Sequence, residues 1–151
     1  MKKQLGVAAF VLFALSLSGC IQAEAAGDDA IAMSLSSTNM VLGVCESMHV
    51  DSLRMEERSP NSNWQPVWTV KESFDVEAGQ TLSPTGVADI DLPAGAEPQV
   101  GRAGQQIAVQ LVDQKDGKTL YAVFDVGVAP SEGVWLHPDG SLTSNPCISR
   151  D

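Results

Sequence analysis

Apolar and polar residues alternate most clearly over residues 107–128, in two runs that flank Asp116-Gly117. Asp-Gly is a preferred sequence for a two-residue type I′ turn, so the two runs predict a β-hairpin. Pairing Lys115 with Lys118 across this turn fixes the register of the strands. The pairs that follow on one apolar face are Leu111 with Ala122, Val109 with Phe124 and Ile107 with Val126. We expect this face to lie in the core and the opposite, mixed face to meet solvent in part.

Five further short runs have the alternation or the β-propensity of strands: residues 49–57, 64–71, 74–76, 87–92 and 134–137. Pro138-Asp139-Gly140 follows the last run, in an order that suits a type I turn followed by a glycine with positive φ. A short helix at 31–35 is the one helical candidate, and it lacks a strong capping residue.

Six or seven short strands, closely spaced turn signals and no long amphipathic helix predict an all-β fold: a small antiparallel β-sandwich with immunoglobulin-like architecture. A small closed β-barrel is the alternative. Trp68 is a candidate core tryptophan, since immunoglobulin domains pack a tryptophan on their inter-sheet disulfide. Cys45 and Cys147 lie too near the ends of the folded region to match that bridge, so the likeness is one of architecture only.

The first twenty residues have a different pattern. Lys2 and Lys3 precede an apolar run over residues 5–17, and no acidic residue occurs before Glu24. A basic start followed by a short apolar run predicts a secretory signal peptide. The run is shorter than the ~20 residues of a membrane-spanning helix, so a retained membrane helix is the less favoured alternative.

The run ends in Leu17-Ser18-Gly19-Cys20, which resembles the lipobox of bacterial lipoproteins. The resemblance implies cleavage before Cys20, a diacylglyceryl thioether on its sulfur and acylation of the new amino terminus. Several acyl chains would anchor the protein durably, because each buried CH₂ contributes ~0.8 kcal/mol. An aspartate after the cysteine resembles an inner-membrane retention signal in enteric bacteria, and this chain has Ile21 there. The expected location is therefore the outer membrane, facing the periplasm.

Ala23-Glu24-Ala25 offers a competing cleavage site, of a form that would release a soluble protein. The cysteine count favours the lipobox, because an exported protein with three cysteines has one left over. Lipidation of Cys20 accounts for that one. It leaves Cys45 and Cys147 as the remaining pair, which an oxidising compartment would let form a disulfide.

These signals divide the chain into three parts. Residues 1–19 are the predicted signal peptide, and residues 20–40 are the lipidated cysteine and a tether rich in Ala, Ser, Gly and Asp, a composition typical of flexible linkers. Residues 41–151 are the predicted single β domain. A disulfide that closes a loop of about 100 residues there contributes at most ~4.7 kcal/mol.

The charge narrows the range of partners. The chain has nineteen acidic and nine basic residues, and removal of residues 1–19 takes away two basic ones, which leaves a net charge of −12. Such a charge argues against nucleic acid as a partner and against adhesion of the protein surface to anionic lipid headgroups. It favours a cationic protein partner, or it reflects an ordinary solvated surface.

Candidate metal ligands are few. His49 and His137 are the only histidines. His49 and Asp51 share a face of a predicted strand, as two metal ligands would, but no third ligand is identifiable. His137 is expected in an exposed turn. We therefore predict no metal and no cofactor.

Candidate catalytic residues are equally few. Gly-x-Ser-x-Gly and phosphate-binding glycine motifs are absent, and all three cysteines have other roles. The acidic pairs Glu56-Glu57 and Asp89 with Asp91 are expected to be solvated rather than to act as glycosidase carboxylates. Residues 113–117 lack the ligand series of a calcium loop. We predict no catalytic residue and no enzymatic activity.

The function expected from these observations is an envelope-anchored, non-enzymatic binding or interaction module. A sharper alternative is a periplasmic inhibitor or immunity protein against a basic enzyme that attacks the envelope. A structural component of an envelope complex is the third alternative, which an exposed apolar patch around Trp64, Trp68 or Trp135 would favour.

Overall fold

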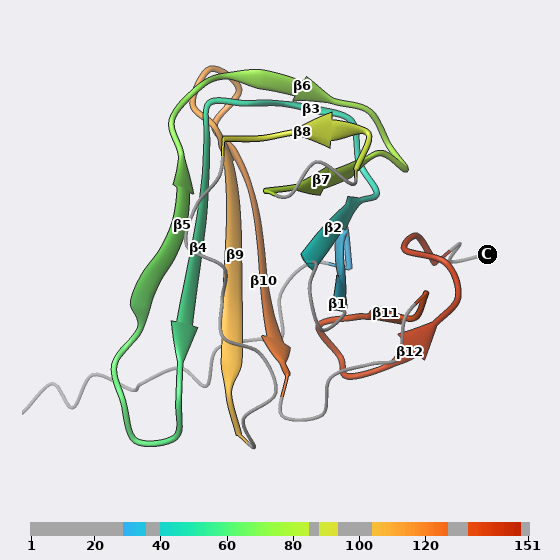
Figure 1. The fold of residues 1–151 in the computed structure, drawn as a ribbon. Helices are drawn as coiled ribbons and strands as arrows, with labels where there is room; N and C mark the ends of the chain where they lie inside the picture. Colours follow the sequence, from blue (N-terminus) through green and yellow to red (C-terminus); the bar gives the residue numbers. More distant parts are fainter. Residues whose placement is uncertain (1–28, 36–39, 85–87, 94–103, 127–132, 149–151) are drawn as a thin grey trace, which may run out of the picture.

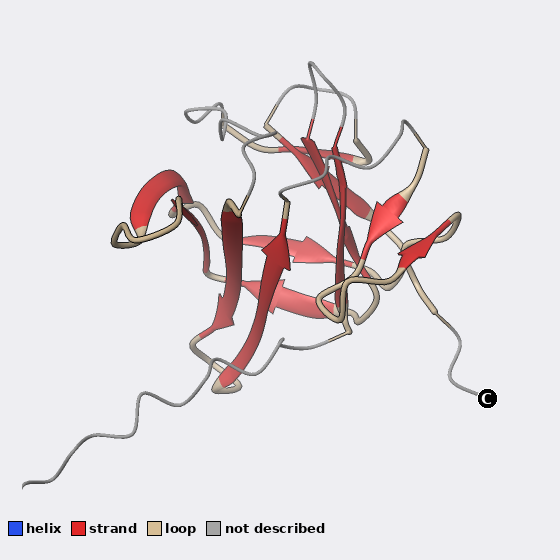
Figure 2. Ribbon diagram, turned by 90° about the horizontal axis from the view of Figure 1, so that it is seen from below, coloured by secondary structure: helices blue, strands red, loops and turns tan. Residues whose placement is uncertain are grey.

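The computed structural model describes residues 29–35, 40–84, 88–93, 104–126 and 133–148, and every regular element in these ranges is a β-strand (Figures 1 and 2). The strands form two larger sheets and a two-stranded ribbon. All strand pairs are antiparallel except β7 with β8. In the described ranges no helix is long and apolar enough to cross a membrane.

The four-stranded sheet has the order β10-β9-β4-β5. Its strands are β4 (Ser52–Arg58), β5 (Gln65–Val70), β9 (Gln106–Asp113) and β10 (Lys118–Asp125). One face is apolar at every second position, so these strands bury alternate side chains.

The six-stranded sheet has the order β12-β11-β1-β2-β7-β8. Its strands are β1 (Ile31–Leu35), β2 (Met40–Val44), β7 (Thr81–Ser83), β8 (Ile90–Asp91), β11 (Trp135–Leu136) and β12 (Leu142–Thr143). The remaining two strands, β3 (Met48–Val50) and β6 (Phe74–Val76), pair with each other as the ribbon. In Figure 1 the ribbon lies across the top, beside the loop that joins β9 to β10.

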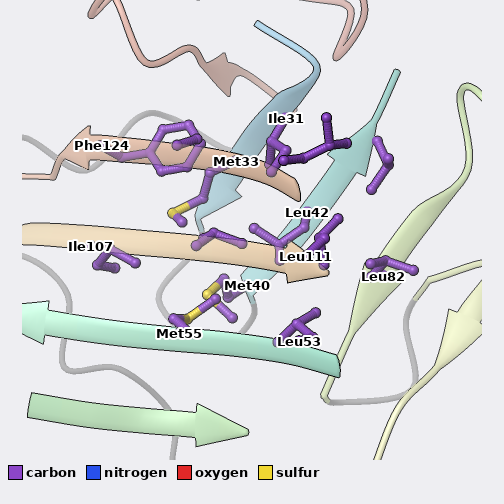
Figure 3. Packing of buried hydrophobic residues seen from close by; sticks show 14 of the residues in the cluster. Ile31, Met33, Met40, Leu42, Leu53, Met55, Leu82, Ile107, Leu111 and Phe124 are labelled. Carbon is purple, nitrogen blue, oxygen red and sulfur yellow. The ribbon is translucent and has the colours of Figure 1, made fainter. Parts of the chain in front are cut away.

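The core lies between the two larger sheets. Figure 3 shows Phe124 of β10 and Leu111 of β9 facing Met33 and Leu42 of the opposite sheet, and all four side chains are buried. Each fully buried side chain of this size contributes about 1.5–3 kcal/mol relative to an exposed one. The all-β sandwich predicted from the sequence is confirmed, and the described strands form open sheets rather than a closed barrel.

The predicted hairpin is confirmed, but its predicted register is wrong by two residues. Lys118 pairs with Asp113, not with Lys115, so residues 114–117 form a four-residue loop. A type I′ turn needs positive φ at both central residues, and of Asp116 and Gly117 only Gly117 has it. The Asp113 carboxylate accepts a hydrogen bond from the backbone N–H of Asp116 at 3.0 Å, which stabilises the wider loop.

The shift of two residues leaves every side chain on its predicted face. The pairs are Leu111 with Leu120, Val109 with Ala122 and Ile107 with Phe124. All six side chains are buried, as expected of the apolar face.

The predicted tether is wrong where it covers residues 31–35. These residues form β1, which pairs with β2 on one side and β11 on the other. Ile31, Ala32 and Met33 are fully buried, so β1 is part of the core and not a helix. The folded domain therefore includes residues before the predicted boundary at 41.

The other predicted strands are present with changed limits. The run 49–57 divides at Asp51 into β3 and β4, the run 74–76 is β6, and the run 87–92 is reduced to the two residues of β8. The runs 64–71 and 134–137 contain β5 and β11. Strands β2, β7 and β12 were not predicted.

Strand β5 is an edge of the four-stranded sheet and carries two features that hinder pairing at its free side. The register with β4 shifts between Met55 and Glu56, which face Trp68 and Pro66, so Val67 is the extra residue of a β-bulge. Pro66 has no N–H to offer to a further strand.

Residues 133–148, which we call the C-terminal clasp, close the domain. The turn 137–140 is as predicted: Gly140 N–H donates to the His137 carbonyl at 2.9 Å, and Gly140 has a φ of 83°. The predicted disulfide between Cys45 and Cys147 is confirmed, with a Cα–Cα distance of 5.3 Å.

The clasp also packs over the middle of β2. A Cβ placed on Gly43 would lie 2.5 Å from Cβ of Pro146 and 3.2 Å from the ring of Trp135. Only glycine leaves room for this approach, so the segment before Cys147 lies directly against the sheet.

Candidate functional site

Charged side chains gather at the end of the molecule formed by the ribbon and the β9–β10 loop. We call residues 46–51, 71–80 and 113–118 the ribbon end. Seven of its residues are acidic and three are lysines: Glu46, Asp51, Glu72, Asp75, Glu77, Asp113 and Asp116, with Lys71, Lys115 and Lys118. With His49 neutral, the ribbon end has a net charge of −4.

Asp51 ties the ribbon to the four-stranded sheet. Its backbone N–H donates to the Val112 carbonyl at 2.7 Å, and its Oδ2 accepts from the backbone N–H of Gln114 at 2.7 Å. The chain turns at Asp51 from β3 into β4, which places this carboxylate under the β9–β10 loop. Two groups of acidic residues, distant in sequence, are thereby held at one end of the molecule.

His49 joins two of these carboxylates. Its Nδ1 donates to Oδ1 of Asp75 at 2.7 Å, and its Nε2 lies 3.6 Å from Oδ1 of Asp51. The hydrogen bond to Asp75 raises the pKa of His49 above 6.5, and the charges of Asp75, Asp51 and Asp113 act in the same direction. Protonation is favoured because it places a positive charge among three carboxylates.

Lys118 forms a close ion pair at the ribbon end. Its Nζ lies 2.6 Å from Oε2 of Glu46, which joins β10 to the turn before β3. The other two lysines, Lys71 and Lys115, are exposed, as are Glu72, Asp75, Glu77 and Asp116. The exposed surface of the ribbon end is therefore predominantly acidic.

The predicted proximity of His49 and Asp51 is confirmed, and the structure adds Asp75 from the paired strand. Sequence reasoning predicted the strand 74–76 but not its pairing with β3, so it missed this third group. In the part of the chain that the structure describes, no three His, Cys, Asp or Glu side chains are arranged to hold a metal ion.

Of the acidic pairs considered for catalysis, Glu56, Glu57 and Asp89 make contacts within the protein, and Asp91 is exposed. Glu56 pairs with Arg54 at 2.5 Å, and Glu57 accepts from Nε2 of Gln105 at 2.9 Å. Asp89 accepts from both the N–H and the hydroxyl of Thr81 at 2.9 Å. The bonds of Glu57 and Asp89 join segments distant along the chain, and the Glu56 pair lies within β4.

The prediction that His137 is exposed is wrong. His137 has a relative exposure of 1%, because the clasp folds over it, and its Nε2 donates to the hydroxyl of Thr143 at 2.8 Å. Thr143 in turn donates to the Asn145 carbonyl at 2.5 Å, and Cys147 N–H donates to Oδ1 of Asn145 at 3.0 Å. His137 thus helps to order the segment that ends in the disulfide.

The three tryptophans do not form an exposed patch. Trp68 is in the core, where its Nε1 donates to the Pro93 carbonyl at 2.9 Å. Trp64 is half-buried under the guanidinium of Arg58, 4.4 Å from the ring centre. Trp135 is half-buried and packs near Pro146, so Trp135 and not Trp68 is the tryptophan close to the disulfide segment.

Cys20 and the signal sequence lie outside the described residues. No protein-family model, no curated protein and no solved structure matches this chain.

Proposed function

We propose that this protein is a lipoprotein of the bacterial envelope, anchored through acyl chains on Cys20, whose β domain binds a cationic protein partner through the ribbon end. The role is one of binding rather than catalysis. The observation that carries the proposal is the excess of carboxylates over lysines at one end of the domain, where Asp113 is buried and the other six carboxylates are at least partly exposed.

Electrostatic complementarity supports this use of the ribbon end. A surface of one sign accelerates encounter with a partner of the opposite sign and excludes partners of like sign. The carboxylates of Asp51 and Asp75 are held in position by hydrogen bonds, so less side-chain freedom is lost when a cationic group binds.

Two further observations support the proposed location of the protein in the bacterial envelope. The lipobox sequence ends at Cys20, and the Cys45–Cys147 disulfide is of the kind that persists in an oxidising compartment such as the periplasm. We place the protein at the outer membrane, facing the periplasm. A basic enzyme that attacks the envelope is the partner for which an acidic, anchored inhibitor or immunity protein is best suited.

Affinity capture from envelope fractions tests the proposal, with the tagged full-length lipoprotein in mild detergent as bait. The variant Glu72→Gln/Glu77→Gln removes two exposed carboxylates of the ribbon end. The matched control, Asp91→Asn/Asp125→Asn, removes the same charge from two exposed positions outside the ribbon end. A basic partner that is released by salt, retained by the control and lost from the ribbon-end variant supports the proposal. Capture of no partner, or of one indifferent to both salt and the ribbon-end variant, overturns it.

A further inference from the structure

Two large apolar side chains are exposed in the part of the chain that the structure describes, Leu142 at 58% and Ile148 at 46%. Both belong to the C-terminal clasp. Hydrogen bonds through Thr143 and Asn145 fold the segment between them into a compact turn. The two exposed apolar residues therefore lie on one part of the molecule.

The clasp lies beside the point where the chain enters the domain. The Ala30 carbonyl accepts a hydrogen bond from the N–H of Cys45 at 2.8 Å, and Cys45 is bonded to Cys147 with a Cα–Cα distance of 5.3 Å. Ile148 follows Cys147 directly, so its Cα lies within about 15 Å of Ala30.

The length of chain before Ala30 limits how far the domain can stand from its anchor. Nine residues lie between Cys20 and Ala30, and each of the ten steps from one residue to the next extends the chain by at most ~3.6 Å. The entry point of the domain is therefore held within about 36 Å of a lipidated Cys20, whatever the conformation of the connecting residues.

The charge of the clasp also suits a lipid surface. Among its sixteen residues Asp139 is the only acidic one, and none is Lys or Arg. The ribbon end, with its net charge of −4, is repelled by the anionic surface that bacterial phospholipids form. The charge-poor clasp therefore approaches such a surface at a lower electrostatic cost than the ribbon end does.

We propose that the clasp, through Leu142 and Ile148, rests on the lipid surface that holds the acyl chains of Cys20. This inference relies on the lipidation in the proposed function and adds an orientation to it. Two apolar side chains bind a bilayer too weakly to recruit a free protein. A tether of this length sets an effective concentration on the order of 10 mM, at which such weak contacts are made.

Environment-sensitive fluorophores test this orientation in the full-length lipoprotein, reconstituted in vesicles of phosphatidylethanolamine and phosphatidylglycerol. The label is attached through Leu142→Cys, through Ile148→Cys, and, as a control, through Lys115→Cys in the exposed β9–β10 loop. Vesicle flotation reports anchoring, and mass analysis of peptides confirms that Cys45 and Cys147 remain bonded.

The expected result is flotation of all three proteins, with a blue-shifted emission and protection from an aqueous quencher at positions 142 and 148 only. Flotation with emission at 142 and 148 equal to that at 115 overturns the orientation and leaves the anchor intact. Failure to float overturns the lipidation, and the orientation with it.

Discussion

The C-terminal clasp and the ribbon end are made of strands of similar length, yet they are stabilised in different ways. The clasp is closed by a covalent bond, buries His137 and packs Pro146 on a glycine. The ribbon end is joined by hydrogen bonds and ion pairs at the surface, such as His49 with Asp75 and Lys118 with Glu46.

In this domain, stability and surface charge are therefore supplied by different regions. Exposed ion pairs contribute about 0–1 kcal/mol each, whereas a disulfide contributes about 2–4 kcal/mol. Changes in the clasp should therefore alter folding, and changes at the ribbon end should alter binding.

Removal of the disulfide is expected to have the largest effect on stability. The variant Cys45→Ser/Cys147→Ser should lose about 2–5 kcal/mol of the free energy of unfolding, because the loop it opens is long. Urea denaturation with and without a reductant measures this loss. The reductant should shift the unfolding midpoint of the native protein and leave that of the double variant unchanged. Equal midpoints for the two proteins without reductant would contradict the role of the disulfide.

A side chain at Gly43 should disturb the packing of the clasp. Gly43→Ala places a Cβ 2.5 Å from that of Pro146 and should cost about 1–3 kcal/mol. Addition of Pro146→Gly removes the clash, so a double-mutant cycle should show favourable coupling between the two substitutions. Strict additivity in urea denaturation would show that the clasp is not in contact with β2.

Charge removal at the ribbon end should leave stability nearly unchanged. Glu72→Gln/Glu77→Gln alters two exposed side chains, and such changes are usually within about 0.5 kcal/mol each. The same variant should weaken the capture of a cationic partner, as measured by salt-dependent binding. A loss of stability comparable to that of the disulfide variant would contradict the view that the ribbon end contributes little to folding.

The smallest effect is expected from the pH dependence of His49. Its pKa is raised in the folded protein, so protonation stabilises the fold below the unfolded value near 6.5. This contribution is lost as the pH rises through the folded pKa. An NMR titration of the His49 ring should give a pKa above 6.5, and Asp75→Asn should lower it. An unchanged titration in that variant would rule out Asp75 as the main cause.

The β9–β10 hairpin shows what the alternation of apolar and polar residues can predict and what it cannot. Alternation determined which side chains of β9 and β10 face the core, because a shift of two residues preserves the face. It could not determine the register, since Asp-Gly suits both a two-residue turn and the four-residue loop with glycine at positive φ. The bond from Asp116 to the Asp113 carboxylate decides between them.

Strand β1 was missed for a different physical reason. It lies inside the six-stranded sheet and is buried on both faces, so its sequence, IAMSL, does not alternate as a half-exposed strand does. Because both faces of β1 are buried, a search for alternating apolar and polar residues could not find this strand.

The local sequence pattern also could not predict the contact of His49 with Asp75. Each residue lies in a strand that the sequence predicted, but the two strands are separated by the whole of β4 and β5. The disulfide, in contrast, followed from a count of cysteines and the predicted compartment, because the predicted lipidation of Cys20 leaves only one pair.

The position of β1 determines how the domain responds to mechanical force. The covalent ring closed by the disulfide spans residues 45–147, so β1 and β2 precede it. A pull applied through the chain before Ala30 loads the hydrogen bonds of β1 with β2 and β11, and no covalent cross-link shares that load. Resistance to such a pull therefore comes from the pairing of β1 with its two neighbours and from its buried side chains, and the disulfide ring stays closed when these contacts yield.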